Sequence, residues 1–182
     1  SGPAFWKCDG SELVAVMRRT PGKAAEFASR MVPGGHCKGY DNLDEFLQHP
    51  GLDAIYLSTR PGTQLDICRK IAAAGKACYV EKPVGRCAEE TQQIAKMFSD
   101  NDLPLYTAYI SRAYDRTQAV RSLLQEGAVG DRLMKVSYKL NGAGGARDVD
   151  GDDLPWRFDA QQSGGGLIMD VGCHVLDRID YI

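Results

Sequence analysis

Short β-branched runs alternate with longer helical patterns over the first two-thirds of the chain. This alternation restricts the fold most, because parallel strands need long crossover connections that usually contain a helix. The predicted fold class is therefore α/β, with βαβ units around a parallel sheet. We expect strands at residues 12–17, 52–58, 77–81 and 103–109, and helices at residues 23–31, 43–50, 64–74 and 88–101.

The helical patterns also predict which side chains face the core. Residues that recur at intervals of three or four lie on one face of a helix. By this rule the inward residues are Ala24, Phe27, Ala28 and Met31 in one helix and Ile94, Ala95, Met97 and Phe98 in another.

The pattern changes after Tyr109, where we place a domain boundary. A short helix at 119–127 leads to Leu133–Leu140, whose period-2 alternation predicts a strand of an antiparallel sheet with one face in water. A glycine-rich polar stretch at 141–153 is expected to form a loop. An apolar helix is expected from about residue 166 to residue 181.

Both ends of the sequence suggest a piece of a longer protein. Residues 1–109 open on what resembles the tail of a helix, and residues 110–182 stop inside a helix after one good strand. A domain built on one strand would leave exposed edges and an uncovered face. We therefore expect partial domains at 1–109 and 110–182, with more chain at each end unless a partner supplies it.

Composition and charge disfavour several classes of partner. The 22 basic and 24 acidic residues are interspersed and give a net charge of −2, so no long-range field gathers nucleic acid or an anionic membrane. No apolar run approaches the roughly 20 residues that span a bilayer, and the first residues lack a signal layout. Six cysteines without a CxxC pair favour reduced thiols. We expect a cytoplasmic protein.

Basic residues follow two of the predicted strands. Arg18 and Arg19 follow the first, and the end of this strand contacts the adenosine ribose in dinucleotide folds. Arginine there accommodates a 2'-phosphate, whereas an acid favours a free hydroxyl. Lys82 follows the strand at 77–81, at the edge where open α/β folds bind ligands, and it can donate a hydrogen bond to a substrate hydroxyl. The alternative for all three is a solvated side chain on a loop.

Asp170 and His174 lie four residues apart on the predicted terminal helix, and Asp177 continues the same face. A carboxylate beside an imidazole can orient it and leave it ready to accept a proton from an alcohol. The alternatives are a satisfied core pair or half of a metal site, for which no third ligand stands at suitable spacing. Three glycines at 164–166 imply that the backbone passes close to a nicotinamide, a substrate or the neighbouring domain.

Three motifs occur in order along the chain: EKPVGR after a strand, Trp156-Arg157, and GGGLIMDVGCHVLD. Together they resemble the glucose-fructose oxidoreductase and inositol dehydrogenase family of sugar, polyol and dihydrodiol dehydrogenases. The resemblance runs from about Ser11 to the last residue. It implies an amino-terminal Rossmann domain and a second α+β domain whose antiparallel sheet carries the substrate site and often the oligomer interface.

The resemblance also implies roles for individual residues. Lys82 matches the family's catalytic lysine, Asp170 its substrate-binding aspartate and His174 its proton-transfer histidine. His174 would take the hydroxyl proton while hydride passes to nicotinamide, with Lys82 polarising the same oxygen. The residues expected to contact the cofactor are Arg18, Arg19, Ser58, Thr59, Arg60, Pro61, Gln64, Glu81 and Lys82. Those expected near the substrate are Arg112, Trp156, Arg157 and Asp170.

The chain departs from the family at two points. Gln64 stands where a histidine is common, and the family's first strand with its phosphate-binding GxGxxG turn is not in the sequence. The Rossmann-type sheet is therefore expected to lack its first strand, and the 182-residue polypeptide is expected to bind cofactor poorly.

The leading hypothesis is an oxidoreductase that uses NADP, with NAD as the alternative cofactor, and acts on a secondary alcohol or ketone of a small sugar, polyol or dihydrodiol. No bound metal is expected, and the complete protein is expected to be a homo-oligomer. The competing hypothesis is a non-catalytic nucleotide-binding or interaction fragment that lost activity through truncation.

Overall fold

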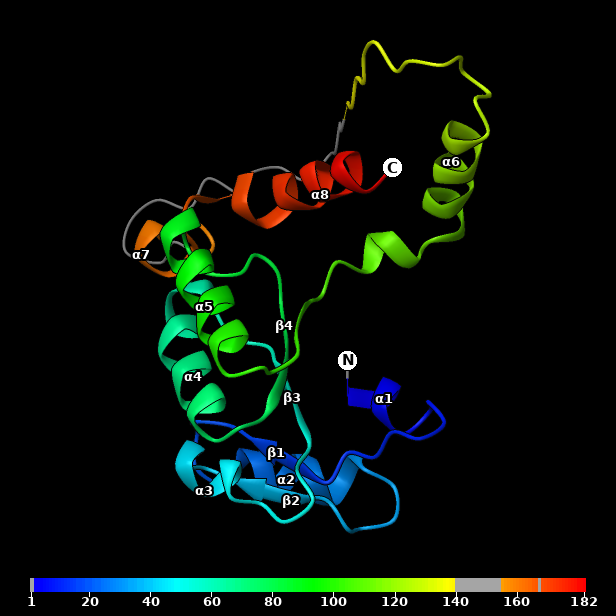
Figure 1. Cartoon of the computed structure of the whole chain (residues 1–182). Helices are drawn as coiled ribbons and strands as arrows, with labels where there is room; N and C mark the ends of the chain where they lie inside the picture. Colours follow the sequence, from blue (N-terminus) through cyan, green and yellow to red (C-terminus); the bar gives the residue numbers. More distant parts are fainter. Residues whose placement is uncertain (1, 140–154, 167) are drawn as a thin grey trace.

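The parallel strands lie before Tyr109, in the region called here the first part of the chain, and they follow the alternating sequence pattern (Figure 1). A computed structural model describes residues 2–139, 155–166 and 168–182. Its strands form a two-stranded sheet and a three-stranded sheet in which β4 is central, with bounds β1 (Ala15–Met17), β2 (Lys38–Tyr40), β3 (Ala54–Leu57), β4 (Ala77–Val80) and β5 (Leu105–Thr107). All strand pairs in these ranges are parallel. The carboxyl ends of the strands in each sheet therefore share one edge.

One buried cluster joins the two sheets. Ala15 of β1 and Tyr40 of β2 pack in the same core as Val80 of β4. The helices α4 (Pro61–Ala73) and α5 (Ala88–Asp100) lie side by side against the three-stranded sheet (Figure 1). Ile71 of α4 and Phe98 of α5 are almost fully buried, and each contributes about 1.5–3 kcal/mol of hydrophobic stabilisation. This core fixes the sheet edge from which Lys82 extends.

The helices of the first part begin close to the predicted positions. The other three are α1 (Gly2–Phe5), α2 (Lys23–Met31) and α3 (Leu43–Leu47). The side chain of Asn42 caps α3 by accepting hydrogen bonds from two main-chain N–H groups of its first turn. α4 begins three residues before the predicted start, because Pro61 occupies its first position, where a missing N–H is harmless.

Two of the predicted core positions are wrong. Met31 is 54% exposed at the end of α2, while Ala24 and Ala28 are buried as expected. Ala95 is exposed, because the buried stripe of α5 consists of residues at positions 90, 94 and 98, and Ala95 lies about 100° around the helix from Ile94. The apolar stripe of α5 is therefore narrower than its sequence pattern suggests.

The described residues after Tyr109, which form the second part of the chain, are mostly helical. Its elements are the 3₁₀ turn η1 (Ile110–Ala113), the helices α6 (Asp115–Gln125) and α7 (Ala160–Ser163), the π turn η2 (Ile168–Gly172) and the helix α8 (Cys173–Tyr181). α6 begins four residues before the predicted helix at 119–127 and ends two residues earlier. The terminal helix expected from about residue 166 to residue 181 is confirmed over the described residues 168–181, where the π-helical segment η2 leads directly into α8. The loop predicted at 141–153 lies outside the described residues.

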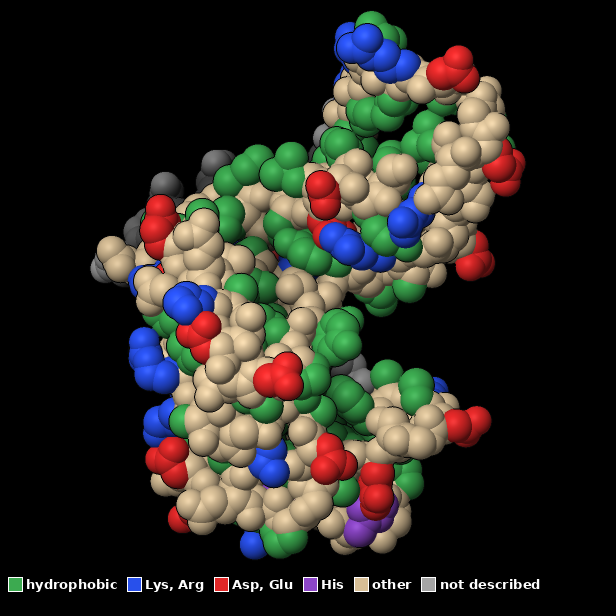
Figure 2. Space-filling model, in the orientation of Figure 1, with side chains coloured by type: hydrophobic (Ala, Val, Ile, Leu, Met, Phe, Trp, Pro, Cys, Tyr) green, Lys and Arg blue, Asp and Glu red, His purple; other side chains and the backbone are tan. Residues whose placement is uncertain are grey.

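The strand predicted at Leu133–Leu140 does not form over residues 133–139, which are exposed and irregular. A strand is stable only when its main-chain groups pair with a neighbour, and no described segment supplies one. The expected antiparallel sheet is therefore absent from the described residues. Apolar side chains lie open along this segment and over α8 (Figure 2), including Met134 and Leu176. Among the described helices, none has the length and apolar character needed to cross a membrane.

Candidate active site

Lys82 lies at the carboxyl edge of the three-stranded sheet, where its sequence position predicts it. β4 ends at Val80, and the peptide bond between Lys82 and Pro83 is cis. The Lys82 ammonium group donates hydrogen bonds to the main-chain oxygen of Asp170, at 2.6 Å, and to its carboxylate Oδ1, at 2.9 Å. These contacts join the sheet edge of the first part to η2 of the second part.

Asp170 holds one cation on each carboxylate oxygen. Lys82 contacts Oδ1, and the guanidinium Nε of Arg157 donates to Oδ2 at 2.9 Å. Partial burial acts to raise the pKa of the Asp170 carboxyl, but the hydrogen bond from Lys82 and the charge of Arg157 outweigh it and hold the pKa below its usual value. Asp170 is therefore an ionised carboxylate between two cations, and this cluster carries a net positive charge.

His174 lies near this cluster on the first turn of α8. Burial and the positive charge of Lys82 lower the pKa of its imidazole, so the neutral form predominates at pH 7. The ring packs edge-on against Tyr109, with 5.9 Å between ring centroids. Within the described part of the chain the imidazole makes no hydrogen bond, and the Asp170 oxygens bond to Lys82 and Arg157. The expected orientation of His174 by direct contact with Asp170 is therefore not what the structure shows.

Arg112 fastens α8 to the turn that joins the two parts. Its guanidinium group binds the Asp177 carboxylate through Nε–Oδ1 at 3.0 Å and Nη2–Oδ1 at 2.6 Å, and the Asp177 side chain is only 5% exposed. The Asp177 carboxylate raises the pKa of Arg112 further, which keeps the pair charged. The expected place of Arg112 near the substrate stays a prediction, and in this structure its guanidinium fixes the helix that carries His174.

The segment expected to pack against the cofactor runs from Ser58 to Pro61, and its first two residues differ from its last two in what they contact. Ser58 is exposed, and the buried hydroxyl of Thr59 has no hydrogen-bond partner among the described residues. The Arg60 guanidinium contacts the second part of the chain, where it binds the Gln162 side chain and lies 5.5 Å from the centre of the Trp156 ring. Pro61 lies on α4 and is buried.

Gln64 is also on α4 and has no exposed surface. Its amide nitrogen donates to the main-chain oxygen of Glu81 at 3.0 Å, and its amide oxygen accepts from the main-chain nitrogen of Gly85 at 2.7 Å. The Glu81 carboxylate accepts a hydrogen bond from the Tyr56 hydroxyl. Gln64 therefore contacts the turn that contains Lys82, and in this position it offers no surface to a cofactor.

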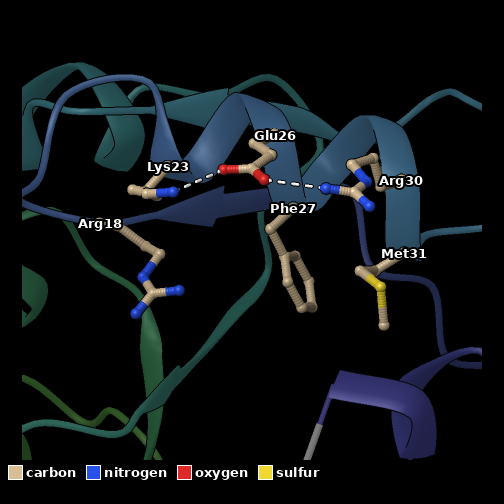
Figure 3. A pocket seen from close by; sticks show the side chains of 6 residues that line it. All are labelled: Arg18, Lys23, Glu26, Phe27, Arg30 and Met31. Atoms are coloured by element: carbon tan, nitrogen blue, oxygen red, sulfur yellow. Dashed lines mark hydrogen bonds and ion pairs between the residues drawn. The ribbon is translucent and has the colours of Figure 1, made fainter.

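Arg18 and Arg19 are exposed after β1. The Arg18 side chain lines a pocket of about 360 Å³ whose other wall is α2 (Figure 3). Glu26 is held between Lys23 at 2.8 Å and Arg30 at 3.0 Å. The Arg18 guanidinium has no hydrogen-bond or ion-pair partner among the described residues. Arg18 and Arg19 therefore follow the first strand, as their sequence positions predict, and their contact with a cofactor stays a prediction.

The glycine-rich stretch before η2 passes close to the first part of the chain. A Cβ at Gly164 would overlap the main-chain carbonyl of Arg86, and a Cβ at Gly62 would lie 2.7 Å from the Gln161 main-chain oxygen. Arg86 also donates to that oxygen at 3.1 Å. Of the three partners expected for this backbone, the structure shows the neighbouring part of the chain. These glycines let α7 approach α4 and the turn after β4.

The charged residues do not form a metal site in the described ranges, where no three His, Cys, Asp or Glu side chains gather. All six cysteines are free thiols, and Cys68 and Cys78 are fully buried.

Family models match most of the chain, in two segments. Residues 2–109 match the model of the oxidoreductase family with an NAD-binding Rossmann fold, and residues 117–182 match the GFO/IDH/MocA C-terminal domain. Oxidoreductase P35 of Formosa agariphila is 27% identical over 177 residues, which are 97% of this chain and 54% of that protein. The trans-1,2-dihydrobenzene-1,2-diol dehydrogenase of Mus musculus is 28% identical over 94% of this chain and 48% of its own length.

Solved structures share the fold. The aldose-aldose oxidoreductase from Caulobacter crescentus, complexed with glycerol, superposes with a TM-score of 0.77 at 24% identity, over 98% of this chain and 52% of that one. Levoglucosan dehydrogenase in complex with NADH gives a TM-score of 0.68 at 23% identity, over 92% of this chain and 43% of that one. The chain spans about half the length of the curated relatives it matches.

Proposed function

Because the chain belongs to the GFO/IDH/MocA oxidoreductase family, we propose that the whole protein transfers hydride between a nicotinamide cofactor and a secondary alcohol or ketone of a sugar, polyol or dihydrodiol. The observation that carries this proposal is the contact between Lys82 and Asp170. It brings a proton donor from the first part and a carboxylate from the second together beside His174. The names of the relatives supply the substrate class.

The three side chains have complementary roles in the proposed reaction. A neutral imidazole accepts a proton, so His174 takes the hydroxyl proton of an alcohol and returns it in the reverse direction. Lys82 donates a hydrogen bond to the same oxygen and stabilises the negative charge that develops there. Asp170 binds a neighbouring substrate hydroxyl and holds the Lys82 ammonium group, while Arg157 fixes the Asp170 carboxylate. Metal is not required for any of these steps.

The residues at the sheet edge fit a nicotinamide dinucleotide. Among the described residues the buried Thr59 hydroxyl after β3 has no hydrogen-bond partner, and such a group is costly unless a ligand satisfies it. Ser58 is exposed beside it, and Glu81 and Lys82 follow the neighbouring strand. We assign these four residues to the nicotinamide half of the cofactor, which supplies the hydride acceptor or donor when bound.

We propose that NADP is the preferred cofactor and NAD the alternative. The support is the exposed Arg18 guanidinium at the end of β1, which has no ion-pair partner in the described part of the chain and has Arg19 beside it. A guanidinium group binds a 2'-phosphate by charge-assisted hydrogen bonds. Glu26, the acid in the same pocket, is already neutralised by Lys23 and Arg30 and does not oppose this binding.

The organisation of the whole protein follows from the same proposal. Residues 1–109 serve as the dinucleotide-binding domain and residues 110–182 as the start of the substrate domain. The exposed apolar side chains of residues 133–138 and α8 support an antiparallel sheet completed in the whole protein, and a homo-oligomer formed through it. Six free thiols support a cytoplasmic location. The assembled lysine, aspartate and arginine cluster does not favour a non-catalytic fragment.

The test is an assay of the whole protein with NADP or NAD and a panel of sugars, polyols and dihydrodiols. We expect reduced cofactor to accumulate with at least one substrate, and we expect His174→Ala to lower kcat by about 10²–10⁴-fold. Unchanged turnover in His174→Ala would refute the assigned role of this residue. Absence of any cofactor-dependent turnover across the panel would refute the function.

A further inference from the structure

We infer that Gln64 is a positioning residue for Lys82, a role that rests on the proposed function for its catalytic consequence. The Gln64 side chain has no exposed surface, and both ends of its amide bind main-chain atoms. These atoms belong to Glu81 and Gly85, which lie on either side of Lys82 along the chain. A single side chain thus spans the turn that presents the ammonium group.

The hydrogen-bond pattern requires both halves of an amide. The Glu81 carbonyl needs a donor, and the Gly85 N–H needs an acceptor. An amide side chain offers one of each within two bonds, whereas an apolar side chain of similar length offers neither. Buried main-chain groups without partners are rare because they are costly. Loss of either function at position 64 would therefore leave a main-chain group of this turn without its hydrogen-bond partner.

The distal end of the turn is held by α5, whereas at the end next to Lys82 the hydrogen bond from Gln64 acts together with that from Tyr56 to Glu81. The Thr91 hydroxyl donates to the Val84 main-chain oxygen, and Arg86 binds Glu90. Gly85 has a φ of +70°, and a Cβ there would lie 2.8 Å from the Glu90 Cβ. The distal end of the turn is thus packed against α5.

By holding the main chain on either side of Lys82, Gln64 determines where the Lys82 ammonium group lies. The ammonium group contacts two oxygens of Asp170, at 2.6 Å and 2.9 Å, and its side chain is only 16% exposed. A shift of the turn would move the ammonium group away from both oxygens and into water. Gln64 therefore acts on Lys82 and not on the cofactor.

The first test measures how fast Lys82 is acetylated in the folded whole protein, with mass spectrometry identifying each lysine. In Gln64→Met and in Gln64→Asn, which is too short to reach both main-chain groups, we expect Lys82 to react about threefold faster or more, as the loss of one or two hydrogen bonds predicts. Gln64→Glu should restore the slow rate, because a carboxyl group that stays protonated in the core donates and accepts like the amide.

Two controls separate positioning from stability. Lys96 pairs with Asp100 on the exposed face of α5 and should react at the same rate in every variant. Ile71→Val shortens another fully buried side chain of α4 and should leave the Lys82 rate unchanged while lowering stability. A slow Lys82 rate in folded Gln64→Met or Gln64→Asn would overturn the inference.

The second test uses the whole protein and separates this inference from the proposed function. If Gln64 positions Lys82, Gln64→Met lowers kcat by at least about tenfold with little change in the KM for NADP or NAD. A raised cofactor KM with unchanged kcat would mean that Gln64 acts on the cofactor and would overturn the inference. Lack of turnover in the unsubstituted protein would refute the function, while the acetylation result would still test the position of Lys82.

Discussion

The ammonium group of Lys82 and the carboxylate of Asp170 lie 2.9 Å apart, although 88 positions separate them in the sequence. Lys82 extends from the carboxyl edge of a parallel sheet, and Asp170 lies on a π turn of the second part. Arg157 binds the other carboxylate oxygen. The contact thus defines the meeting point of the two parts, and the following predictions test its surroundings.

The His174 imidazole should titrate below its ordinary pKa of 6.5, because burial and the charge of Lys82 both disfavour its cationic form. The unfolded chain binds this proton more tightly, so the contribution of His174 to stability declines as the pH falls through about 6.5. We expect the histidine C–H resonances in NMR spectra to show this low midpoint. In Lys82→Met it should rise, while the resonances of His36 and His49 should not respond to the substitution. A midpoint that ignores Lys82→Met would contradict the electrostatic account.

Arg112→Met should destabilise the fold by about 2 kcal/mol, because it leaves the buried Asp177 carboxylate without its cation. The value lies below the range for fully buried pairs because the Arg112 side chain is 44% exposed. Urea unfolding followed by circular dichroism measures the change. Lys96→Met breaks an exposed pair on α5 and serves as the control, with an expected loss of no more than about 0.5 kcal/mol. Equal losses in the two variants would show that the Arg112–Asp177 pair stabilises the fold no more than an exposed ion pair does.

The Arg18 guanidinium should determine cofactor preference in the whole protein. We expect Arg18→Ala to weaken binding of NADPH by about 10- to 100-fold, since a charge-assisted hydrogen bond contributes about 1.5–3 kcal/mol. Binding of NADH should change by less than about threefold, because NADH lacks the 2'-phosphate. Fluorescence titration with both cofactors gives the ratio, and Arg30→Ala, which removes a cation already paired with Glu26, is the matched control. Equal losses for NADPH and NADH in Arg18→Ala would refute NADP selectivity.

Gly164→Ala should destabilise the contact between the two parts. Both Gly164 and Gly75 have positive φ values, +86° and +66°, so alanine is strained at either position. Only at Gly164 would the new methyl group overlap the Arg86 main chain, whereas nothing lies within 4 Å of a Cβ at Gly75. Urea unfolding should therefore show a loss at least about 1 kcal/mol larger for Gly164→Ala than for Gly75→Ala. Similar losses would mean that α7 does not pack tightly against the turn after β4.

The sequence predicts elements whose signals are local. Apolar patterns of the expected period mark β1, β3, β4, β5 and α2, and the location of Lys82 follows from the strand before it. β2 is not predicted, because Lys38, Gly39 and Tyr40 show no apolar alternation and only their pairing with β1 identifies them. The strand at 133–140 fails for the converse reason: its alternation is clear, yet no described neighbour pairs with it.

In the candidate site, too, the sequence predicts local features but not contacts between distant segments. Motif order identifies Lys82, Asp170 and His174, but sequence spacing does not reveal that Asp170 contacts Lys82 and Arg157 instead of the imidazole. The Arg112–Asp177 pair spans 65 positions, and the two hydrogen bonds of Gln64 bracket a turn 17 to 21 residues away. Such contacts depend on how the helices pack against the sheet, which the local pattern of residues does not encode. The departure from histidine at position 64 was the only signal in the sequence that pointed to Gln64.

The most direct test of the Lys82–Asp170 centre is a double-mutant cycle in the whole protein. It compares kcat/KM for the unsubstituted enzyme, Lys82→Met, Asp170→Asn and the double variant on one substrate. Because the two side chains act as a unit, we predict that each single variant loses about 10²-fold or more and that the double variant loses little beyond either one. Losses that multiply in the double variant would show that the two residues act independently, which contradicts the central claim.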